Sequence, residues 1–439
     1  MASKRIWGWY FFDWASQPYA TLLMTFVFAP YMASLLGDGT AAQAAWGFGV
    51  GMAGVVIAVL APFLGAVADR GGRRRGWIAG FSLLYVIGAW GLWWAQPGDF
   101  SLTLVLLSFG LGLVAMEFAT IFTNAMLPGL APRAEIGRIS GAGWGFGYAG
   151  GVVSLALVLL FLAEGPGGRT LVGLAPAFGL DPALREGTRA VGPFTAIWYA
   201  LFMIPFFLWT REAGPPRLPM RAALAGALPD LMASLRRLPR RPNLLRFLIA
   251  SMLYRDALNG IFVFGGIYAA GVLGWSVPMV GVFGILAAIS GAIFAWAGGR
   301  WDARFGPKPV VAVTLLLLTA ASIGEVFVAR DRLFGLPVGA GSRLPDAAFL
   351  LIGLVIGAAG GAMQAASRTM MVHQADPARM TEGFGLYALT GKATAFLAPL
   401  SIGIATTAGG SQQAGILPVI VLFLLGLGLL LFVDPDGHA

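Results

Sequence analysis

Long apolar segments recur along the whole chain, and short polar stretches separate them. Twelve of these segments reach or approach the roughly 20 residues that a helix needs to cross the hydrocarbon core of a bilayer. They cover residues 5–35, 42–68, 76–96, 100–127, 139–163, 191–209, 244–272, 276–299, 307–328, 346–372, 382–407 and 413–433. The pattern predicts an all-α polytopic membrane protein with twelve transmembrane helices.

The composition supports this prediction and excludes several kinds of site. Only 11% of the 439 residues are charged and 58% are apolar, whereas roughly a quarter of the residues in a soluble domain are charged. The absence of cysteine excludes disulfide frameworks, thiolate metal sites and thiol nucleophiles. The two histidines, His373 and His438, leave little for a metal or catalytic centre. We therefore expect no metal and no enzymatic activity.

The basic residues predict the orientation in the membrane. If both termini lie inside, 20 of the 29 Lys and Arg residues fall in cytoplasmic loops, and six fall in loops on the other side. Short cytoplasmic loops carry such an excess. The prediction is that both termini are cytoplasmic. The preference for Arg over Lys is typical of a GC-rich bacterial genome, so we expect a bacterial inner membrane.

A basic segment, residues 210–243, divides the chain into two halves of six spans each, residues 1–209 and 244–439. It begins with a Pro-rich stretch, and five leucines then recur at helical spacing with arginines off that stripe. The leucines are Leu224, Leu228, Leu231, Leu235 and Leu238. This spacing predicts an amphipathic helix on the anionic inner leaflet. Nucleic-acid binding is not expected, because no aromatic platform accompanies the arginines.

The two halves repeat a loop motif. GAVADRGGRRR (65–75) follows the second span and GGRWDARFGPK (298–308) follows the eighth, so Asp302 corresponds to Asp69. Internal duplication of six-helix halves is typical of secondary transporters. The motif also resembles the signature of the major facilitator superfamily, which implies two pseudo-symmetric six-helix bundles. The candidate gating residues are Gly65, Asp69, Arg70, Arg73, Arg74, Asp302, Arg304 and Lys308.

A closer resemblance covers nearly the whole chain. Six segments, in the right order, resemble the vacuole-effluxer family of major facilitators, whose best-known members are the autophagy-related amino-acid exporters of the yeast vacuole. They are YFFDWASQPYA (10–20), FTNAMLPGLAP (122–132), ISGAGWGFGYAGG (139–151), YRDALNG (254–260), QAASR (364–368) and FGLYALTGKATAFLAP (384–399). The resemblance implies the facilitator fold and a transport role.

Two segments match the dinucleotide-binding fingerprint G-x-G-x-x-G, namely residues 49–54 and 145–150. Each lies inside an apolar span with no preceding strand, so the context that the fingerprint requires is missing. Close packing between helices explains these glycines better. We expect no nucleotide and no other cofactor.

Polar and ionisable residues within the spans are the candidate site, because such residues are costly in a membrane and mark transport pathways. In major facilitators, spans one, four, seven and ten line a central cavity, so the resemblance places most of these residues there. The alternative is that they form static ion pairs between helices. The candidates for substrate binding or coupling are Asp13, Gln17, Glu117, Asn124, Trp144, Tyr148, Arg255, Asp256, Asn259, Gln364, Arg368, Tyr387 and Lys392. Glu325, near the end of its span, is expected to be an interfacial charge, and His373 a loop residue.

These observations favour a secondary active transporter of a small polar or zwitterionic solute that works by alternating access and is coupled to protons. Arg255 or Lys392 would hold a carboxylate, and Asp13 or Asp256 would hold an ammonium group or the coupling proton. The alternatives are an exporter of amphipathic or lysolipid-like molecules, a channel or receptor, and a membrane-embedded enzyme. The expected partners are the solute, protons and the lipid bilayer, and we expect a monomer. The pattern leaves the substrate, the coupling ion and the transport direction open.

Overall fold

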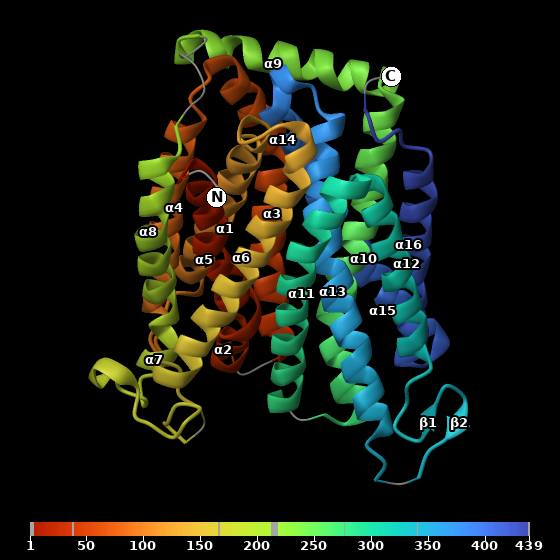
Figure 1. The fold of residues 1–439 in the computed structure, drawn as a ribbon. Helices are drawn as coiled ribbons and strands as arrows, with labels where there is room; N and C mark the ends of the chain where they lie inside the picture. Colours follow the sequence, from red (N-terminus) through yellow and green to blue (C-terminus); the bar gives the residue numbers. More distant parts are fainter. Residues whose placement is uncertain are drawn as a thin grey trace. The chain divides into compact units, whose positions relative to one another are not determined.

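The computed structural model describes residues 4–36, 39–165, 167–211, 218–275, 277–339 and 341–437. It contains two compact units (Figure 1). Unit 1 comprises Met1–Leu130 and Phe146–Gly226, and unit 2 comprises Ala131–Gly145 and Ala227–Ala439. Residues 212–217 of the basic segment and His438 lie outside the described residues.

Unit 1 is built from long helices, with short helical turns in the loops between them. Helix α4 packs on α5 and α8, and α1 packs on α8. The elements are α1 (Lys4–Pro18), η1 (Tyr19–Phe26), α2 (Phe28–Leu36), α3 (Gly39–Gly71), α4 (Arg74–Gly91), η2 (Leu92–Trp94), α5 (Leu102–Asn124), η3 (Leu127–Gly129), the second half of α6 (Arg133–Phe161), η4 (Ala177–Gly179), α7 (Glu186–Arg189) and α8 (Val191–Trp209). Helix α6 therefore contributes residues to both units.

The apolar pattern predicts one continuous helix for the first span, but the helix there is not regular throughout. A π-helical segment, η1, follows Pro18 and separates α1 from α2. At its first residue, the buried Tyr19 hydroxyl donates a hydrogen bond to the carbonyl of Phe109 on α5, at 2.5 Å. Because π-helical turns widen the helix and occur often at functional sites, this segment is a distinctive feature of unit 1.

Unit 2 has a similar helical construction. Helix α13 packs on α11 and α12, and α16 packs on α10 and α12. The elements are the first half of α6, most of α9 (Met220–Arg237), η5 (Leu238–Arg240), α10 (Pro242–Leu273), α11 (Val277–Phe305), α12 (Pro307–Val326), β1 (Arg332–Leu333), β2 (Leu336–Pro337), α13 (Leu344–Gln374), η6 (Pro377–Arg379), α14 (Met380–Ala393), α15 (Leu397–Gly409) and α16 (Gln412–Leu431). The two short strands form an antiparallel hairpin in the loop between α12 and α13.

The basic segment contains helix α9, whose buried face differs from the predicted leucine stripe. Ala223, Ala227 and Leu231 are buried, whereas Leu224 and Leu228 are exposed. The buried face is therefore formed mainly by alanines, which allow close packing against the protein. The leucine stripe lies partly outside that contact.

The eleventh span is also interrupted. The sequence pattern predicts one helix over 382–407, but α14 ends at Ala393 and α15 begins at Leu397. The break contains Thr394, whose backbone is non-helical. Broken helices in the membrane require other groups to satisfy the freed backbone N–H and C=O groups, and unit 2 supplies such a group from α10.

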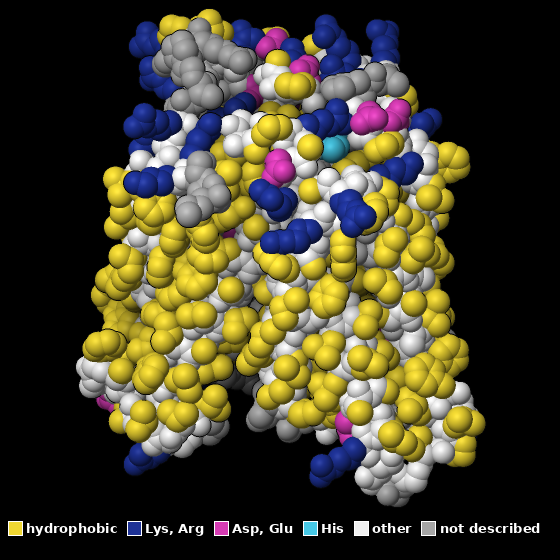
Figure 2. All heavy atoms as spheres, viewed as in Figure 1, with side chains coloured by type: hydrophobic (Ala, Val, Ile, Leu, Met, Phe, Trp, Pro, Cys, Tyr) yellow, Lys and Arg dark blue, Asp and Glu magenta, His cyan; other side chains and the backbone are white. Residues whose placement is uncertain are grey.

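Within the described residues, twelve helical segments are long and apolar enough to cross a membrane, which confirms the predicted number of spans. Apolar side chains cover most of the visible lateral face of each unit, and Lys and Arg side chains gather toward one end (Figure 2). Many large apolar residues are correspondingly exposed, among them Val59, Leu107, Leu208 and Leu351. An exposed apolar belt of this kind is typical of a surface that is solvated by lipid.

Candidate functional site

Arg255 lies near the middle of α10 in unit 2, about 20 Å along the helix from Pro242 at the usual helical rise. Its guanidinium group is half-buried and lies over the ring of Tyr387 on α14, with Cζ 4.0 Å from the ring centroid. Its Nη1 also donates a hydrogen bond to the Tyr387 carbonyl, at 2.9 Å. Gly391, one turn along α14, leaves room for the guanidinium, because a Cβ there would lie 2.8 Å from Nη2. The Arg255 side chain is therefore held against α14.

A chain of hydroxyl groups fixes the Tyr387 ring on which Arg255 lies. The hydroxyl of Ser367 on α13 is 2.8 Å from the Tyr387 hydroxyl and 2.5 Å from that of Tyr254 on α10. The ring of Phe247 on α10 stacks with that of Tyr387, with centroids 6.0 Å apart. Three helices are thus cross-linked beside Arg255. We call Arg255, Tyr387, Ser367 and Tyr254 the arginine shelf.

Arg255 has no acidic partner among the described residues. Every salt bridge within that part of the chain involves other basic residues. Its neighbour Asp256 points elsewhere, because adjacent positions on a helix do not face one another. One of its five N–H groups donates to Tyr387. The guanidinium is therefore equipped to bind an anionic group that is not part of the described protein.

Asp256 holds the start of α15, the helix that follows the break in the eleventh span. Its Oδ2 accepts a hydrogen bond from the backbone N–H of Ala398, at 2.8 Å. That N–H belongs to the first turn of α15, where the helix itself supplies no acceptor. Asp256 is 3% exposed, and its other oxygen, Oδ1, has no hydrogen-bond partner among the described residues. The carboxyl group thus caps a broken helix and keeps one oxygen available.

The remaining predicted residues of this region lie on the same helices. Lys392 is half-buried in the last turn of α14, where a cation complements the helix dipole. Asn259 is exposed one turn after Arg255 on α10, and Gln364 is half-buried one turn before Arg368 on α13. The structure therefore brings Arg255 into contact with Tyr387 on α14. Asp256, the next residue of α10, contacts the start of α15 instead.

Arg368 makes a separate set of contacts within unit 2. Its Nε donates to the hydroxyl of Ser140 at 2.9 Å, and its Nη2 donates to the Ser140 carbonyl at 2.6 Å. The Ser140 hydroxyl donates in turn to the carbonyl of Ala365, at 2.7 Å. The guanidinium carbon lies 5.5 Å from the ring centroid of Trp144, and Arg368 is only 4% exposed. These bonds join α13 to the first half of α6.

Glycines on the first half of α6 allow α11 to approach closely. A Cβ on Gly141 would overlap the backbone of Ala295 and Gly299, and one on Gly137 would overlap the carboxyl group of Asp302. Asp302 is 3% exposed and therefore lies buried against α6. A pocket of about 360 Å³ opens beside it. Its lining residues are Arg133, Ala134, Gly137, Asp302, Ala303, Gly306, Pro307 and His373.

The two repeated loops differ in their ionic contacts. In unit 1, Asp69 forms a salt bridge with Arg74 at 2.7 Å, and Arg70 donates to the carbonyl of Gly226 at 3.3 Å. In unit 2, Asp302 forms no salt bridge with any described residue. Lys308 donates instead to the carbonyl of Leu431, at the end of α16.

The other residues of the repeated loops lie at the surface or in the core. Gly65 is buried in α3, whereas Arg73 is exposed immediately before α4. Arg304 is exposed beside the ring of Phe305. The repeated motif therefore supports two different local arrangements, one ion-paired and one buried against a glycine.

In unit 1, the predicted residues of the first span face the second half of α6. A Cβ on Gly147 would lie 3.2 Å from the Asp13 Cβ, and one on Gly151 would lie 2.9 Å from the Gln17 Cγ. Asp13 and Gln17 therefore share the face that contacts α6, as their spacing predicts. The half-buried candidates on α5 and α6 in this unit are Glu117, Asn124 and Tyr148.

Comparison with known proteins agrees with this architecture. Residues 40–437 match the family model described as "Vacuole effluxer Atg22 like". The chain belongs to this family. The Bacillus subtilis protein YxiO, described as an uncharacterized MFS-type transporter, is 23% identical over 99% of this chain and 96% of its own length. Autophagy-related protein 22 of Cryptococcus neoformans is 23% identical over 67% of this chain, which matches about half (52%) of the fungal protein.

Solved structures show the same fold. The fucose:proton symporter FucP of E. coli superposes with a TM-score of 0.68 and 17% identity, over 98% of each chain. This member of the vacuole-effluxer family therefore has the major facilitator fold, as its sequence predicts. It is a multi-pass membrane transporter of the major facilitator superfamily and not an enzyme.

Several residues that organise the site were not among the candidates, because each is an uncharged residue in an apolar span. Tyr254 and Ser367 build the arginine shelf, and Ser140 binds Arg368. All three lie in segments that carry the family resemblance, which is the signal that could have indicated them. Glu325 was expected at the interface, but it is 2% exposed and so lies in the interior of unit 2. That expectation is wrong because it took only the position along the span into account, whereas packing within unit 2 buries the side chain.

Proposed function

We propose that this chain is a proton-coupled secondary transporter of small zwitterionic solutes of the amino-acid type, and that Arg255 binds the solute carboxylate. The observation that carries this proposal is the half-buried Arg255 guanidinium at membrane depth, which has no acidic partner among the described residues. An unpaired cation in a membrane is costly, so it marks a pathway or binding site by default.

A carboxylate is the anionic group that best fits the arginine shelf. Guanidinium groups bind carboxylates through two parallel hydrogen bonds. The Tyr387 ring and carbonyl restrict the orientation of the guanidinium, so little side-chain freedom is lost when a ligand binds. Lys392, at the end of α14, adds positive charge on the same helix. The shelf therefore favours an anionic end group over a neutral sugar.

Asp256 is our first candidate for the coupling proton, and Asp13 is the candidate in unit 1. Asp256 is buried, holds the start of α15 through one oxygen and has a second oxygen without a partner. Protonation would change the charge at the break between α14 and α15 without removing the acceptor for Ala398. A change in that break is a physical route by which proton binding could alter the arginine shelf on α14.

The repeated loops and the contacts of α6 are our candidates for gating elements. The salt bridge between Asp69 and Arg74, and the bonds between Arg368 and Ser140, each join two helices through charged groups. Such contacts form in one conformational state and break in another when a ligand shifts the balance of states. We place both termini in the cytoplasm of a bacterium and propose a monomer.

An exporter of amphipathic compounds is the second candidate. It is favoured by the aromatic surroundings of α1 in unit 1, where Trp14 stacks on Phe146 at 4.6 Å and on Trp198 at 5.6 Å between ring centroids. These rings pack on one another, so they are less available to a ligand than the guanidinium of Arg255. We therefore rank this function below amino-acid transport.

A thermal-shift screen of the purified protein tests the proposal. The ligands are amino acids, dipeptides, sugars and lysolipids. The variants are Arg255→Ala and, as a matched control at an exposed position of the same helix, Ile249→Ala. We expect one or more amino acids to raise the melting temperature of the wild type and the control but not that of Arg255→Ala. Stabilisation by lysolipids alone, or by amino acids equally in all three proteins, would overturn the assignment.

A further inference from the structure

Glu325 lies in the last turn of α12, at the end of the helix opposite the repeated loop with Lys308. Glu325 and Lys308 are separated by about 26 Å along α12 at the usual helical rise. Although it is acidic and near a helix end, Glu325 is 2% exposed. The arginine shelf and the Asp256 cap do not use it. A buried carboxyl group without an assigned role therefore remains in unit 2.

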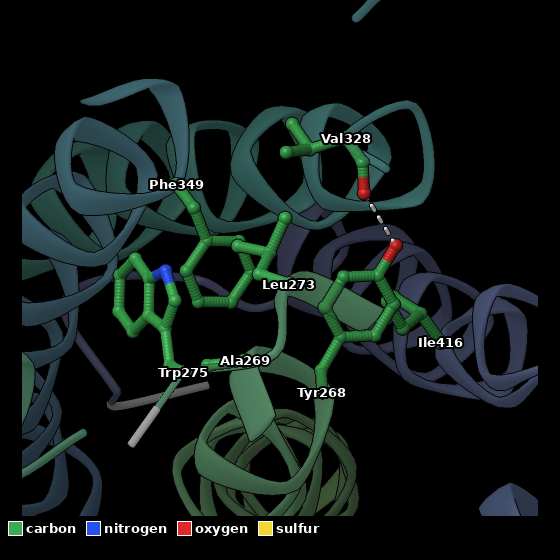
Figure 3. Close-up of a cluster of buried hydrophobic side chains, with 7 residues drawn as sticks. All are labelled: Tyr268, Ala269, Leu273, Trp275, Val328, Phe349 and Ile416. Carbon is green, nitrogen blue, oxygen red and sulfur yellow. Dashed lines mark hydrogen bonds between the residues drawn. The ribbon is translucent and has the colours of Figure 1, made fainter. Parts of the chain in front are cut away.

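A cluster of aromatic and aliphatic residues lies beside this last turn (Figure 3). The ring of Tyr268 on α10 stacks on that of Phe349 on α13, with centroids 5.6 Å apart. The Tyr268 hydroxyl is 3.0 Å from the carbonyl oxygen of Glu325 and 2.9 Å from that of Val328. The last carbonyls of a helix have no partner within it. Tyr268 supplies a hydrogen-bond donor to the Glu325 carbonyl and so holds the backbone of Glu325 in place.

The carboxyl group itself has an oxygen without a partner. Oε2 of Glu325 is buried and accepts no hydrogen bond from the described residues. None of the Lys, Arg and His side chains in that part of the chain forms a salt bridge with it. The group is thus buried without a counter-charge.

Among the described residues, no cation pairs with Glu325 from the helices beside α12, which are α11, α13, α16 and, through Tyr268, α10. The charged residues of α11, namely Arg300, Asp302 and Arg304, lie in its last turns, near the loop with Lys308 and far from Glu325. From α10, the titratable neighbour is Tyr268, and from α16 the polar residues of the first turn are the uncharged Gln412 and Gln413. From α13, Asp346 is the nearest acidic group to the same aromatic cluster, but Arg330 and the Trp275 indole N–H already bind it. Arg330 therefore pairs with Asp346, and Arg332 pairs with Asp331. Arg343, immediately before α13, lies near Asp346 and forms no described salt bridge with Glu325.

We propose that Glu325 is a proton-binding site, distinct from Asp256, that takes up and releases a proton during the transport cycle. Burial of an ionised carboxylate without a partner costs several kcal/mol, and a bound proton removes that charge. Buried acidic residues of this kind occur in the proton relays of pumps and transporters. The proposal rests on the proposed function for its role in transport, but proton binding itself can be tested without a substrate.

Infrared difference spectra of the purified protein between pairs of pH values test this assignment. A protonated carboxyl group has a C=O stretching band that disappears on ionisation. We expect the wild type to show a titrating band from Glu325 that Glu325→Gln lacks, while a band from Asp256, if that group also titrates, remains in both proteins. Asp346→Asn is the matched control, because Asp346 borders the same cluster but is ion-paired; it should keep the Glu325 band.

Two further measurements keep the result decisive. If Glu325→Gln does not fold, judged by its melting temperature, Glu325→Asp should shift the band rather than abolish it. The spectra are also recorded with sodium replaced by choline at constant ionic strength. An unchanged band in Glu325→Gln, or a titration that moves with sodium, would overturn the proton assignment. A failure of amino-acid binding in the thermal-shift screen would leave these spectra unaffected, so the two proposals fail separately.

Discussion

The Asp256→Ala variant tests how the broken eleventh span is held together. The substitution removes the acceptor for the Ala398 N–H, which Oδ2 of Asp256 now binds at 2.8 Å. Loss of a helix cap costs about 0.5–2 kcal/mol, and a buried donor left without a partner costs about 1–3 kcal/mol. Because the Ala398 residue is fully buried, we expect a loss of about 2 kcal/mol in the local stability of α15. That loss corresponds to a rise of roughly 30-fold in the opening equilibrium.

Hydrogen exchange of the peptides that cover the start of α15 measures this opening. Asp256→Asn keeps an oxygen that can accept the same hydrogen bond, and Asn caps helices about as well as Asp. We therefore expect near-normal protection in Asp256→Asn and strongly reduced protection in Asp256→Ala. Asn259→Ala, an exposed position one turn along α10, is the control. If Asp256→Ala exchanges no faster than Asn259→Ala, Asp256 does not hold α15.

Three further predictions concern the shelf, the glycine contacts and the topology. Gly391→Ala should weaken amino-acid stabilisation in the thermal-shift screen as much as Arg255→Ala does, because the new Cβ would lie 2.8 Å from the Arg255 guanidinium. Gly403→Ala is the control and should keep the stabilisation, because a Cβ at Gly403 meets open space. Gly137→Ala should destabilise the protein by about 1–3 kcal/mol in chemical unfolding, since the new methyl group overlaps the Asp302 carboxyl group, whereas Gly281→Ala should have little effect. A cysteine in place of Leu171, which is 73% exposed, should react with an impermeant reagent in intact cells, and one in place of Asp436 only after lysis; the reverse labelling would contradict the orientation.

The twelve spans could be predicted from the sequence because a membrane helix must bury about 20 consecutive apolar residues in lipid. The repeat of Asp69 and Asp302 could likewise be found from the motif. The local structure of the spans could not. The break between Ala393 and Leu397 depends on Asp256 from another helix, and the hydropathy of the segment contains no trace of that contact.

The candidate site was predicted unevenly for a similar reason. Charged residues in apolar spans stand out, so Arg255 and Asp256 could be named from sequence. The contacts of Arg255 depend on Ser367 and Tyr254, which are uncharged and do not stand out in the hydropathy pattern, although both lie in segments that carry the family resemblance. The prediction for Glu325 was wrong because the position of a residue along a helix does not determine its burial. Burial depends on how the neighbouring helices pack, which the sequence pattern does not show.

Transport by protein reconstituted in liposomes tests the central claim most directly. The substrate is the amino acid that gives the largest thermal shift, and the driving force is a pH gradient across the liposome membrane. We predict that the wild type accumulates this solute above its equilibrium concentration, that Asp256→Asn only equilibrates it, and that Arg255→Ala does neither. Accumulation by Arg255→Ala at the wild-type level, or its absence in the wild type under a pH gradient, would contradict the account.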